Sequence, residues 1–135
     1  MNHVFVDTAA FLALLNKSDY LYDTAQKIML ALIAQEAQLL TSEFILLEVG
    51  DALSHPRFRR NIPGFVASLY RQEGLTVIPV QTHLLSKAWQ LYASRPDKEW
   101  GITDCTSFVI MQEQHIQQAF TSDHHFVQAG FTKLM

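Results

Sequence analysis

The stretch His3-Val4-Phe5-Val6-Asp7-Thr8 places an acidic residue directly after a short apolar run. The β-branched and aromatic side chains favour a buried β-strand over residues 4–6, because such side chains fit a covered, pleated surface. Residues 9–15 are typical of a helix, with Asp7 or Thr8 at its N-cap. A strand that leads directly into a helix predicts an α/β protein with parallel strands.

The same alternation of short strands and helices continues along the chain. Strands are predicted at residues 4–6, 38–41, 75–80 and 118–121, with an edge strand at 131–134. Helices are predicted at residues 9–15, 22–35, 43–53, 64–72, 82–94, 103–115 and 123–129, and Pro56 is expected to end the third of them. The expected fold class is therefore α/β, with a central, mostly parallel sheet and helices on both faces; the strand order stays open.

Length and composition limit the possible classes of protein. The chain has 135 residues, 49% of them hydrophobic and 17% charged, which suits one globular domain over residues 1–135. No uncharged run is long and apolar enough for a membrane span, and no Lys or Arg precedes the first apolar run as in a secretory signal. The single cysteine, Cys105, cannot form an internal disulfide, so a cytoplasmic location is expected.

The net charge of −3 disfavours a protein held on nucleic acid by bulk electrostatics. A bound metal ion reverses the local charge, so binding of a phosphodiester through a metal stays compatible with this composition.

Four acidic residues stand where the expected fold brings its backbone toward one place: Asp7, Glu48, Asp104 and Asp123. Asp7 and Asp123 each follow a predicted strand, and ligand sites of parallel sheets lie outside the carboxyl ends of the strands. Asp104 opens a predicted helix. Taken singly, the three aspartates are also explained as helix caps, so only their combination indicates a site.

Glu48 is not explained as a cap, because it lies in the middle of a predicted helix. Its helical neighbours Phe44, Ile45 and Ala52 are apolar, and Asp51 is a further acid. A carboxylate on such a face needs a partner, and a divalent cation is one. Mg²⁺ and Mn²⁺ prefer oxygen ligands, whereas a chain with one cysteine does not suit a structural zinc site.

Four segments resemble the motifs of PIN domains, and they are most similar to those of VapC-type toxins and close solitary relatives. These segments are Val4-Phe5-Val6-Asp7-Thr8, Leu47-Glu48-Val49, Asp97-Lys98-Glu99-Trp100-Gly101-Ile102-Thr103-Asp104-Cys105 and Phe120-Thr121-Ser122-Asp123-His124-His125-Phe126. The resemblance covers essentially the whole chain, in the right order, and no acidic position of the family pattern is missing.

The resemblance implies a three-layer α/β/α PIN-like domain that acts as a metal-dependent endoribonuclease. The acidic pocket would hold Mg²⁺ or Mn²⁺, with Asp7 and Asp104 as direct ligands and Glu48 and Asp123 completing the shell or holding a second ion. Thr8, Thr103 and Ser122 flank these motifs and are candidates for orienting carboxylates, water or phosphate.

The expected reaction is hydrolysis of RNA phosphodiester bonds by a metal-activated water, which leaves 5′-phosphate and 3′-hydroxyl ends. The resemblance further implies the toxin of a toxin–antitoxin pair, a homodimer, and an antitoxin protein as partner. Two alternatives stay open: a non-catalytic PIN-fold module that binds RNA or protein, and a nuclease that acts on DNA.

Three other features each have two explanations. The cluster Arg57, Arg59 and Arg60 either tracks an RNA backbone or forms an ordinary solvated loop. Trp100 either stacks on an unpaired base or packs its loop against the next helix. The pair His124-His125 either contacts phosphate or belongs to a turn that is set by local packing.

Overall fold

The computed structural model describes residues 2–135 and contains one five-stranded sheet in which every neighbouring pair is parallel. The strand order is β3-β2-β1-β4-β5. The strands are β1 (His3–Val6), β2 (Gln38–Ser42), β3 (Leu75–Ile78), β4 (Gln118–Phe120) and β5 (Thr132–Lys133). The predicted parallel sheet is confirmed, and β1 occupies its centre.

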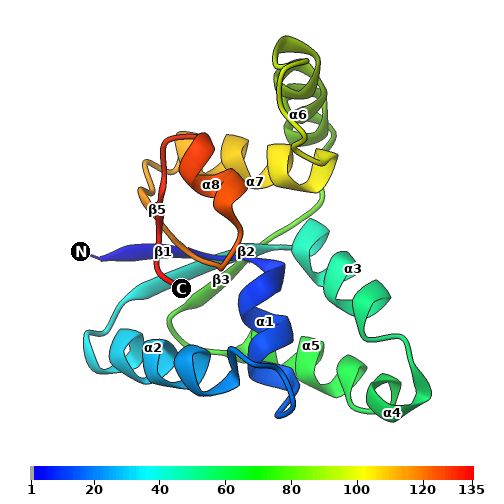
Figure 1. Cartoon of the computed structure of the whole chain (residues 1–135), viewed down its shortest axis with the longest axis vertical. Coiled ribbons are helices and arrows are strands. Elements are labelled where there is room, and N and C mark those ends of the chain that lie inside the picture. The colour runs from blue at the N-terminus through cyan, green and yellow to red at the C-terminus, as the bar shows by residue number, and fades with distance from the viewer. Residues whose placement is uncertain (1) are drawn as a thin grey trace.

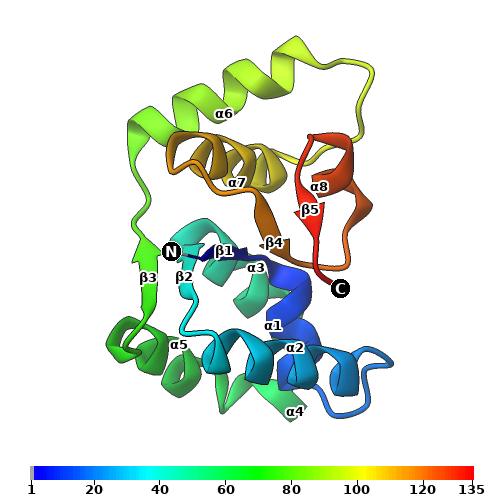
Figure 2. The same ribbon diagram turned by 90° about the vertical axis from the view of Figure 1, so that its left-hand side faces the viewer.

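Helices cover both faces of the sheet, which gives the predicted three-layer α/β/α arrangement (Figures 1 and 2). They are α1 (Thr8–Leu15), α2 (Tyr22–Ala34), α3 (Glu43–Ala52), α4 (Pro56–Arg59), α5 (Ile62–Arg71), α6 (Thr82–Ser94), α7 (Ile102–Glu113) and α8 (His124–Gln128). In both views α6, α7 and α8 lie on one side of the sheet, and α1, α2, α4 and α5 lie on the other.

The core forms where the apolar runs of the sequence are covered on both sides. Val4, Phe5 and Val6 are all fully buried, as expected for a central parallel strand. Residues 105–111 of α7 are also buried without a break, because this helix lies between the sheet and α6. Cys105 is fully buried within this run, where it packs as a small hydrophobic residue.

Proline chemistry explains two differences from the predicted elements. Pro56 does more than end a helix: it begins α4, where the ring nitrogen of His55 accepts a hydrogen bond from the Arg57 amide. The third strand stops at Ile78, two residues earlier than predicted, because Pro79 has no amide hydrogen to continue the ladder. The next amide, that of Val80, donates instead to Glu43 Oε1 at 2.8 Å.

The direction in which the chain adds strands reverses at β1. From β1 it proceeds outward through β2 to β3, and then returns to the other side of β1 for β4 and β5. Such a reversal leaves the carboxyl ends of two adjacent strands open for ligands. Those two strands, β1 and β4, are the ones that Asp7 and Asp123 follow.

Candidate active site

Asp7 lies between β1 and α1, and only 5% of it is exposed. Its amide donates to the Phe120 carbonyl, which extends the β1–β4 pairing by one residue. Its carboxylate makes no capping bond to α1; Oδ2 instead accepts a hydrogen bond of 2.7 Å from Thr121 Oγ1. Burial raises the pKa of Asp7 from 3.8 to about 7, against the opposing effect of the Thr121 hydroxyl. Asp7 therefore occupies the N-cap position of α1, as predicted, but its carboxylate does not make the capping bond.

Glu48 lies in the middle of α3, as predicted, and is half-buried. Its Oε1 accepts a hydrogen bond of 2.5 Å from Thr8 Oγ1, at the start of α1. Burial raises the pKa of Glu48, and the negative charges of Asp104 and Asp123 add to the rise. The partner that this carboxylate finds is thus a hydroxyl, which leaves its negative charge uncompensated.

Asp104 lies in the first turn of α7, where its Oδ2 accepts a hydrogen bond of 3.2 Å from the Gly101 amide. The predicted capping role is therefore present, but the same oxygen also lies 3.1 Å from His125 Nδ1. Burial raises the pKa of Asp104, and the negative charge of Asp123 raises it further. One carboxylate thus serves both the helix end and the acidic site.

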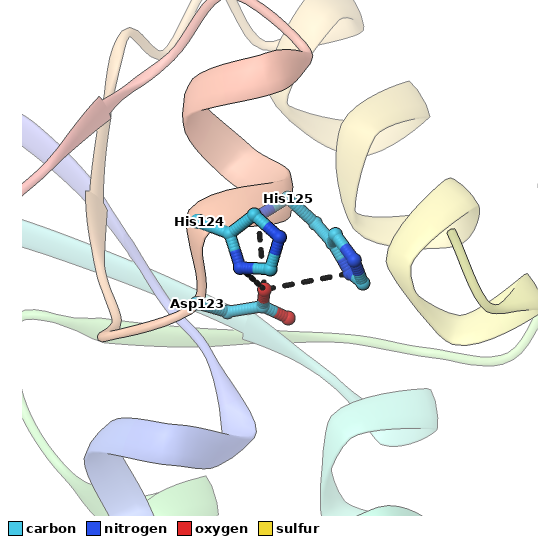
Figure 3. Close-up of side chains that lie close together, drawn as sticks. All are labelled: Asp123, His124 and His125. Carbon is cyan, nitrogen blue, oxygen red and sulfur yellow. Dashed lines mark hydrogen bonds and ion pairs between the residues drawn. The ribbon is translucent and has the colours of Figure 1, made fainter. Parts of the chain in front are cut away.

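Asp123 is the N-cap residue of α8, and its Oδ1 accepts a hydrogen bond of 2.9 Å from the His125 amide. Figure 3 shows its carboxylate beneath the rings of His124 and His125, with the His125 ring extending toward α7. The ring Nδ1 atoms of His124 and His125 lie 3.8 and 3.4 Å from Asp123 Oδ1. The cap interpretation is correct for Asp123, and the histidines add a second set of contacts.

The four carboxylates come from four separate parts of the chain and affect one another electrostatically. Asp104 and Glu48 each contribute to the raised pKa of Asp7, and Asp123 contributes to those of Glu48 and Asp104. Within residues 2–135, no Lys or Arg forms an ion pair with any of the four. Partly buried carboxylates that repel one another and have no Lys or Arg partner suit a divalent metal ion.

Histidine adds nitrogen ligands to this site. Ligand atoms of Asp123, His124 and His125 all lie within 4.8 Å of one another, a grouping able to hold a metal ion. Imidazole suits transition metals, whereas Mg²⁺ favours oxygen ligands alone. The compact group at the start of α8 is thus Asp123, His124 and His125, whereas the four carboxylates stay the ligand set predicted from the sequence.

Two residues of the site were not predicted as such. Thr121 is fully buried; its hydroxyl donates to Asp7 and also accepts a hydrogen bond of 3.0 Å from the Asp123 amide. His125 contacts both Asp104 and Asp123, so contacts with carboxylates, rather than packing alone, define its turn. The signals in the sequence were their position within two residues of Asp123 and their place in the segment 120–126 that resembles a PIN-domain motif.

The three residues predicted to support the acidic site differ in the contacts that they make. Thr8 contacts Glu48, as its predicted supporting role requires. Thr103 and Ser122 are half-buried beside Asp104 and Asp123, and the Thr103 carbonyl accepts from the Thr106 hydroxyl. Their predicted roles toward water or phosphate stay predictions.

The structure also shows where the arginine cluster and Trp100 lie, two features for which the sequence leaves a role in RNA binding open. The cluster Arg57, Arg59 and Arg60 belongs to α4 and the residue after it, and in both views α4 lies apart from the beginnings of α7 and α8. Trp100 is only 6% exposed, and its ring packs edge-to-face on Phe108 with centroids 5.0 Å apart. The packing interpretation is therefore the correct one for Trp100.

The sequence matches the family model of the PIN domain over residues 4–132, so the chain belongs to the PIN domain family. It is 28% identical over 131 residues to the 23S rRNA-specific endonuclease VapC20 of Mycobacterium tuberculosis, with 97% of each chain covered. A crystal structure of that VapC20, described as a Sarcin-Ricin loop cleaving toxin, superposes with a TM-score of 0.83 over 96% of each chain.

More distant structures share the fold alone. VapBC2 from Rickettsia felis, bound to a DNA fragment from its promoter, gives a TM-score of 0.71 at 13% identity over 97% of this chain and 96% of that one. FitAcB from Neisseria gonorrhoeae gives a TM-score of 0.68 at 14% identity, over 96% of this chain and 95% of that one. The predicted PIN family and the three-layer α/β/α fold are both confirmed.

Proposed function

We propose that this chain is a divalent-metal-dependent endoribonuclease and the toxin of a toxin–antitoxin pair. The single observation that carries the proposal is that the partly buried carboxylates of Asp7, Glu48, Asp104 and Asp123 affect one another electrostatically and, within residues 2–135, form no ion pair with a Lys or Arg. The likeness to VapC20, a 23S rRNA-specific endonuclease, supports RNA as the substrate. That likeness extends over 97% of this chain and 97% of VapC20.

The donor set fits Mg²⁺ or Mn²⁺, because carboxylate oxygens dominate it. Asp7 and Asp104 would hold the principal ion, and Glu48 and Asp123 would complete the shell or hold a second ion. When bound, such an ion activates water for attack on phosphorus and stabilises the leaving oxygen. The raised pKa of Asp7 matters here, since a cation near the carboxylate would return it to the ionised form.

The chain's own residues have supporting tasks in this scheme. Thr121 keeps Asp7 oriented through its hydroxyl, and Thr8 does the same for Glu48. His125 lies between Asp104 and Asp123 and so sets the separation of these carboxylates. Hydrogen-bonded supports of this kind orient metal ligands and are needed for full affinity.

A protein partner, a homodimer and a cytoplasmic location are also part of the proposal. The likeness to VapBC and FitAB complexes supports an antitoxin as protein partner. A homodimer is proposed from the family resemblance. Among residues 2–135, no helix combines the length and apolar character that a bilayer crossing requires. A cytoplasmic location stays a prediction from the single cysteine.

The test is cleavage of a labelled RNA that contains the sarcin–ricin loop of 23S rRNA, with Mg²⁺, with Mn²⁺ and with chelator. Asp104→Asn serves as the control for contaminating nuclease. Metal-dependent cleavage that the variant loses, with 5′-phosphate and 3′-hydroxyl ends, is the expected result. A 2′,3′-cyclic phosphate end would contradict hydrolysis by water. Cleavage of a matched DNA instead of RNA would favour the DNA-acting alternative, and metal binding without cleavage would favour a binding module.

A further inference from the structure

A hollow of about 410 Å³ lies at the end of α6 and the loop that precedes α7. This volume is within the range of sites that take small organic groups. Figure 1 shows this part of the chain, at the change from green to yellow, above the sheet and next to the beginning of α7. Aromatic and charged side chains make up most of the lining of the hollow, among them Trp89, Tyr92, Arg95, Lys98, Glu99 and Trp100, and the backbone of Gly101 is also part of it.

Two of the aromatic side chains face solvent, which core packing does not explain. Trp89 is 51% exposed and Tyr92 is 48% exposed. Their ring centroids are 5.4 Å apart at an interplanar angle of 77°, a favourable edge-to-face pair. The two rings therefore pack against each other and leave apolar surface exposed to solvent beside the hollow.

The charges at the hollow largely compensate one another. Arg95 forms two hydrogen bonds of 3.0 Å with Asp97 and lies over the Trp100 ring, so it acts as part of the wall. Lys98 Nζ lies 3.9 Å from the same carboxylate and keeps donors for a ligand. Glu99 is the acidic residue of the lining. Recognition here therefore depends more on ring faces than on net charge.

Two residues in the wall of the hollow are hydrogen-bonded to Asp104 and to α8, the elements that carry part of the candidate active site. The Gly101 amide, in the wall of the hollow, donates to Asp104 Oδ2 at 3.2 Å. Trp100 Nε1 donates to Gln128 Oε1 of α8 at 3.0 Å. The loop that forms the hollow thus also places Asp104 and is tied to the helix that begins after Asp123.

We propose that this hollow is a substrate subsite that receives an unpaired base of the RNA close to the cleaved phosphodiester. The base would stack on the exposed rings of Trp89 and Tyr92, while Lys98 would contact an adjacent phosphate. Every base offers a ring face, so aromatic stacking suits a displaced nucleotide of any sequence. This inference rests on the proposed ribonuclease function, because it assigns a second contact to the same substrate.

The test is RNA binding, measured by fluorescence anisotropy with a labelled sarcin–ricin loop RNA and the full chain carrying Asp104→Asn, which prevents cleavage. Adding Trp89→Ala is expected to weaken binding about tenfold, the size of a lost stacking contact. Adding Trp89→Phe is expected to recover most of the affinity. The matched control is Tyr20→Ala, because Tyr20 is an exposed aromatic residue, 89% exposed, outside this hollow.

A second readout tests the phosphate contact. Lys98→Ala is expected to lower the slope of log Kd against log salt by about one, whereas exposed Lys17→Ala leaves it unchanged. In the cleaving chain, Trp89→Ala is expected to raise KM more than it lowers kcat. Unchanged melting temperatures of the variants would show that the fold is intact.

The outcomes separate this inference from the proposed function. If the chain cleaves RNA but Trp89→Ala binds and cleaves as the unmodified chain does, the subsite is wrong and the enzyme stands. If no cleavage is found but Trp89→Ala weakens RNA binding, the ribonuclease function is wrong, and the hollow is an RNA-binding surface and not a subsite of an enzyme. If the variants bind RNA normally but lose self-association or antitoxin binding, the hollow is a protein interface and the inference is overturned.

Discussion

Thr121 Oγ1 donates a hydrogen bond of 2.7 Å to Asp7 Oδ2 and accepts one of 3.0 Å from the Asp123 amide. A single buried hydroxyl thereby ties the carboxylate after β1 to the backbone that carries the carboxylate after β4. The two metal-ligand candidates are thus held in a fixed relation by the pairing of adjacent strands.

Removal of this hydroxyl should cost both stability and metal affinity. In Thr121→Val the side chain keeps its shape, but Asp7 loses a donor and the Asp123 amide loses an acceptor. We expect a loss of about 1–3 kcal/mol in the free energy of unfolding and a weaker Mn²⁺-induced rise in melting temperature. Thermal unfolding with and without Mn²⁺ measures both. Thr132→Val, at an exposed strand position, is the control and should change neither.

The metal-free chain should become less stable as the pH rises from about 4 to 7. The pKa of Asp7 is raised from 3.8 to about 7 in the folded state, so within this window the unfolded chain releases a proton that the folded chain keeps. The free energy of unfolding should fall by at most about 4 kcal/mol from this group. The raised pKa values of Glu48 and Asp104 act in the same direction.

Urea unfolding in chelator across this pH range measures the effect. Asp7→Asn should flatten the profile, because the amide does not titrate. Exposed Asp23→Asn is the control and should keep the slope. A slope that survives unchanged in Asp7→Asn would show that other groups cause it.

Metal should stabilise the folded chain, because binding to the folded state alone raises the free energy of unfolding by about 2.7 kcal/mol at a hundredfold excess over Kd. Mg²⁺ or Mn²⁺ should therefore raise the melting temperature, and chelator should reverse the rise. Asp104→Asn should remove most of the rise, whereas Asp51→Asn, an exposed change on α3, should keep it. An equal rise in both variants would place the ion elsewhere.

Substitution of His125 should reduce metal binding and cleavage more than substitution of His124. The His125 side chain is 20% exposed and contacts Asp104 and Asp123, whereas that of His124 is 72% exposed. His125→Ala should lower Mn²⁺ affinity or cleavage about 10–100-fold, the usual loss when a supporting contact of a metal ligand is removed. His124→Ala should have little effect, as measured by metal titration and cleavage rate. Equal losses in both variants would instead favour Asp123, His124 and His125 as the ligand set.

The chain should form a homodimer in solution. Large apolar side chains are exposed on two helices, namely Leu30 and Ile33 on α2 and Leu47 on α3, and such surface often marks an interface. Light scattering should give twice the mass of the chain. A monomer at all concentrations would count against the dimer.

Local patterns were sufficient for much of the fold and of the site. The apolar run before Asp7, the helical spacing around Glu48 and the N-terminal position of Asp104 each depend on residues within a few positions of one another. Strand ends and helix starts are properties of such short segments. This is why the elements and the four carboxylates could be predicted without coordinates, whereas α4 was missed, because Pro56 both ends helices and begins them.

The alternation of strands and helices, and the acids that follow or begin them, can be recognised from short segments of the sequence. The strand order, and with it the neighbours of each acid, follows only from the folded arrangement. Thr121 and Asp7 are 114 residues apart and Thr8 and Glu48 are 40 apart, yet each pair is hydrogen-bonded. Such contacts exist only because β4 lies beside β1 and α1 packs near α3, and pairing between distant segments leaves no local pattern in the sequence.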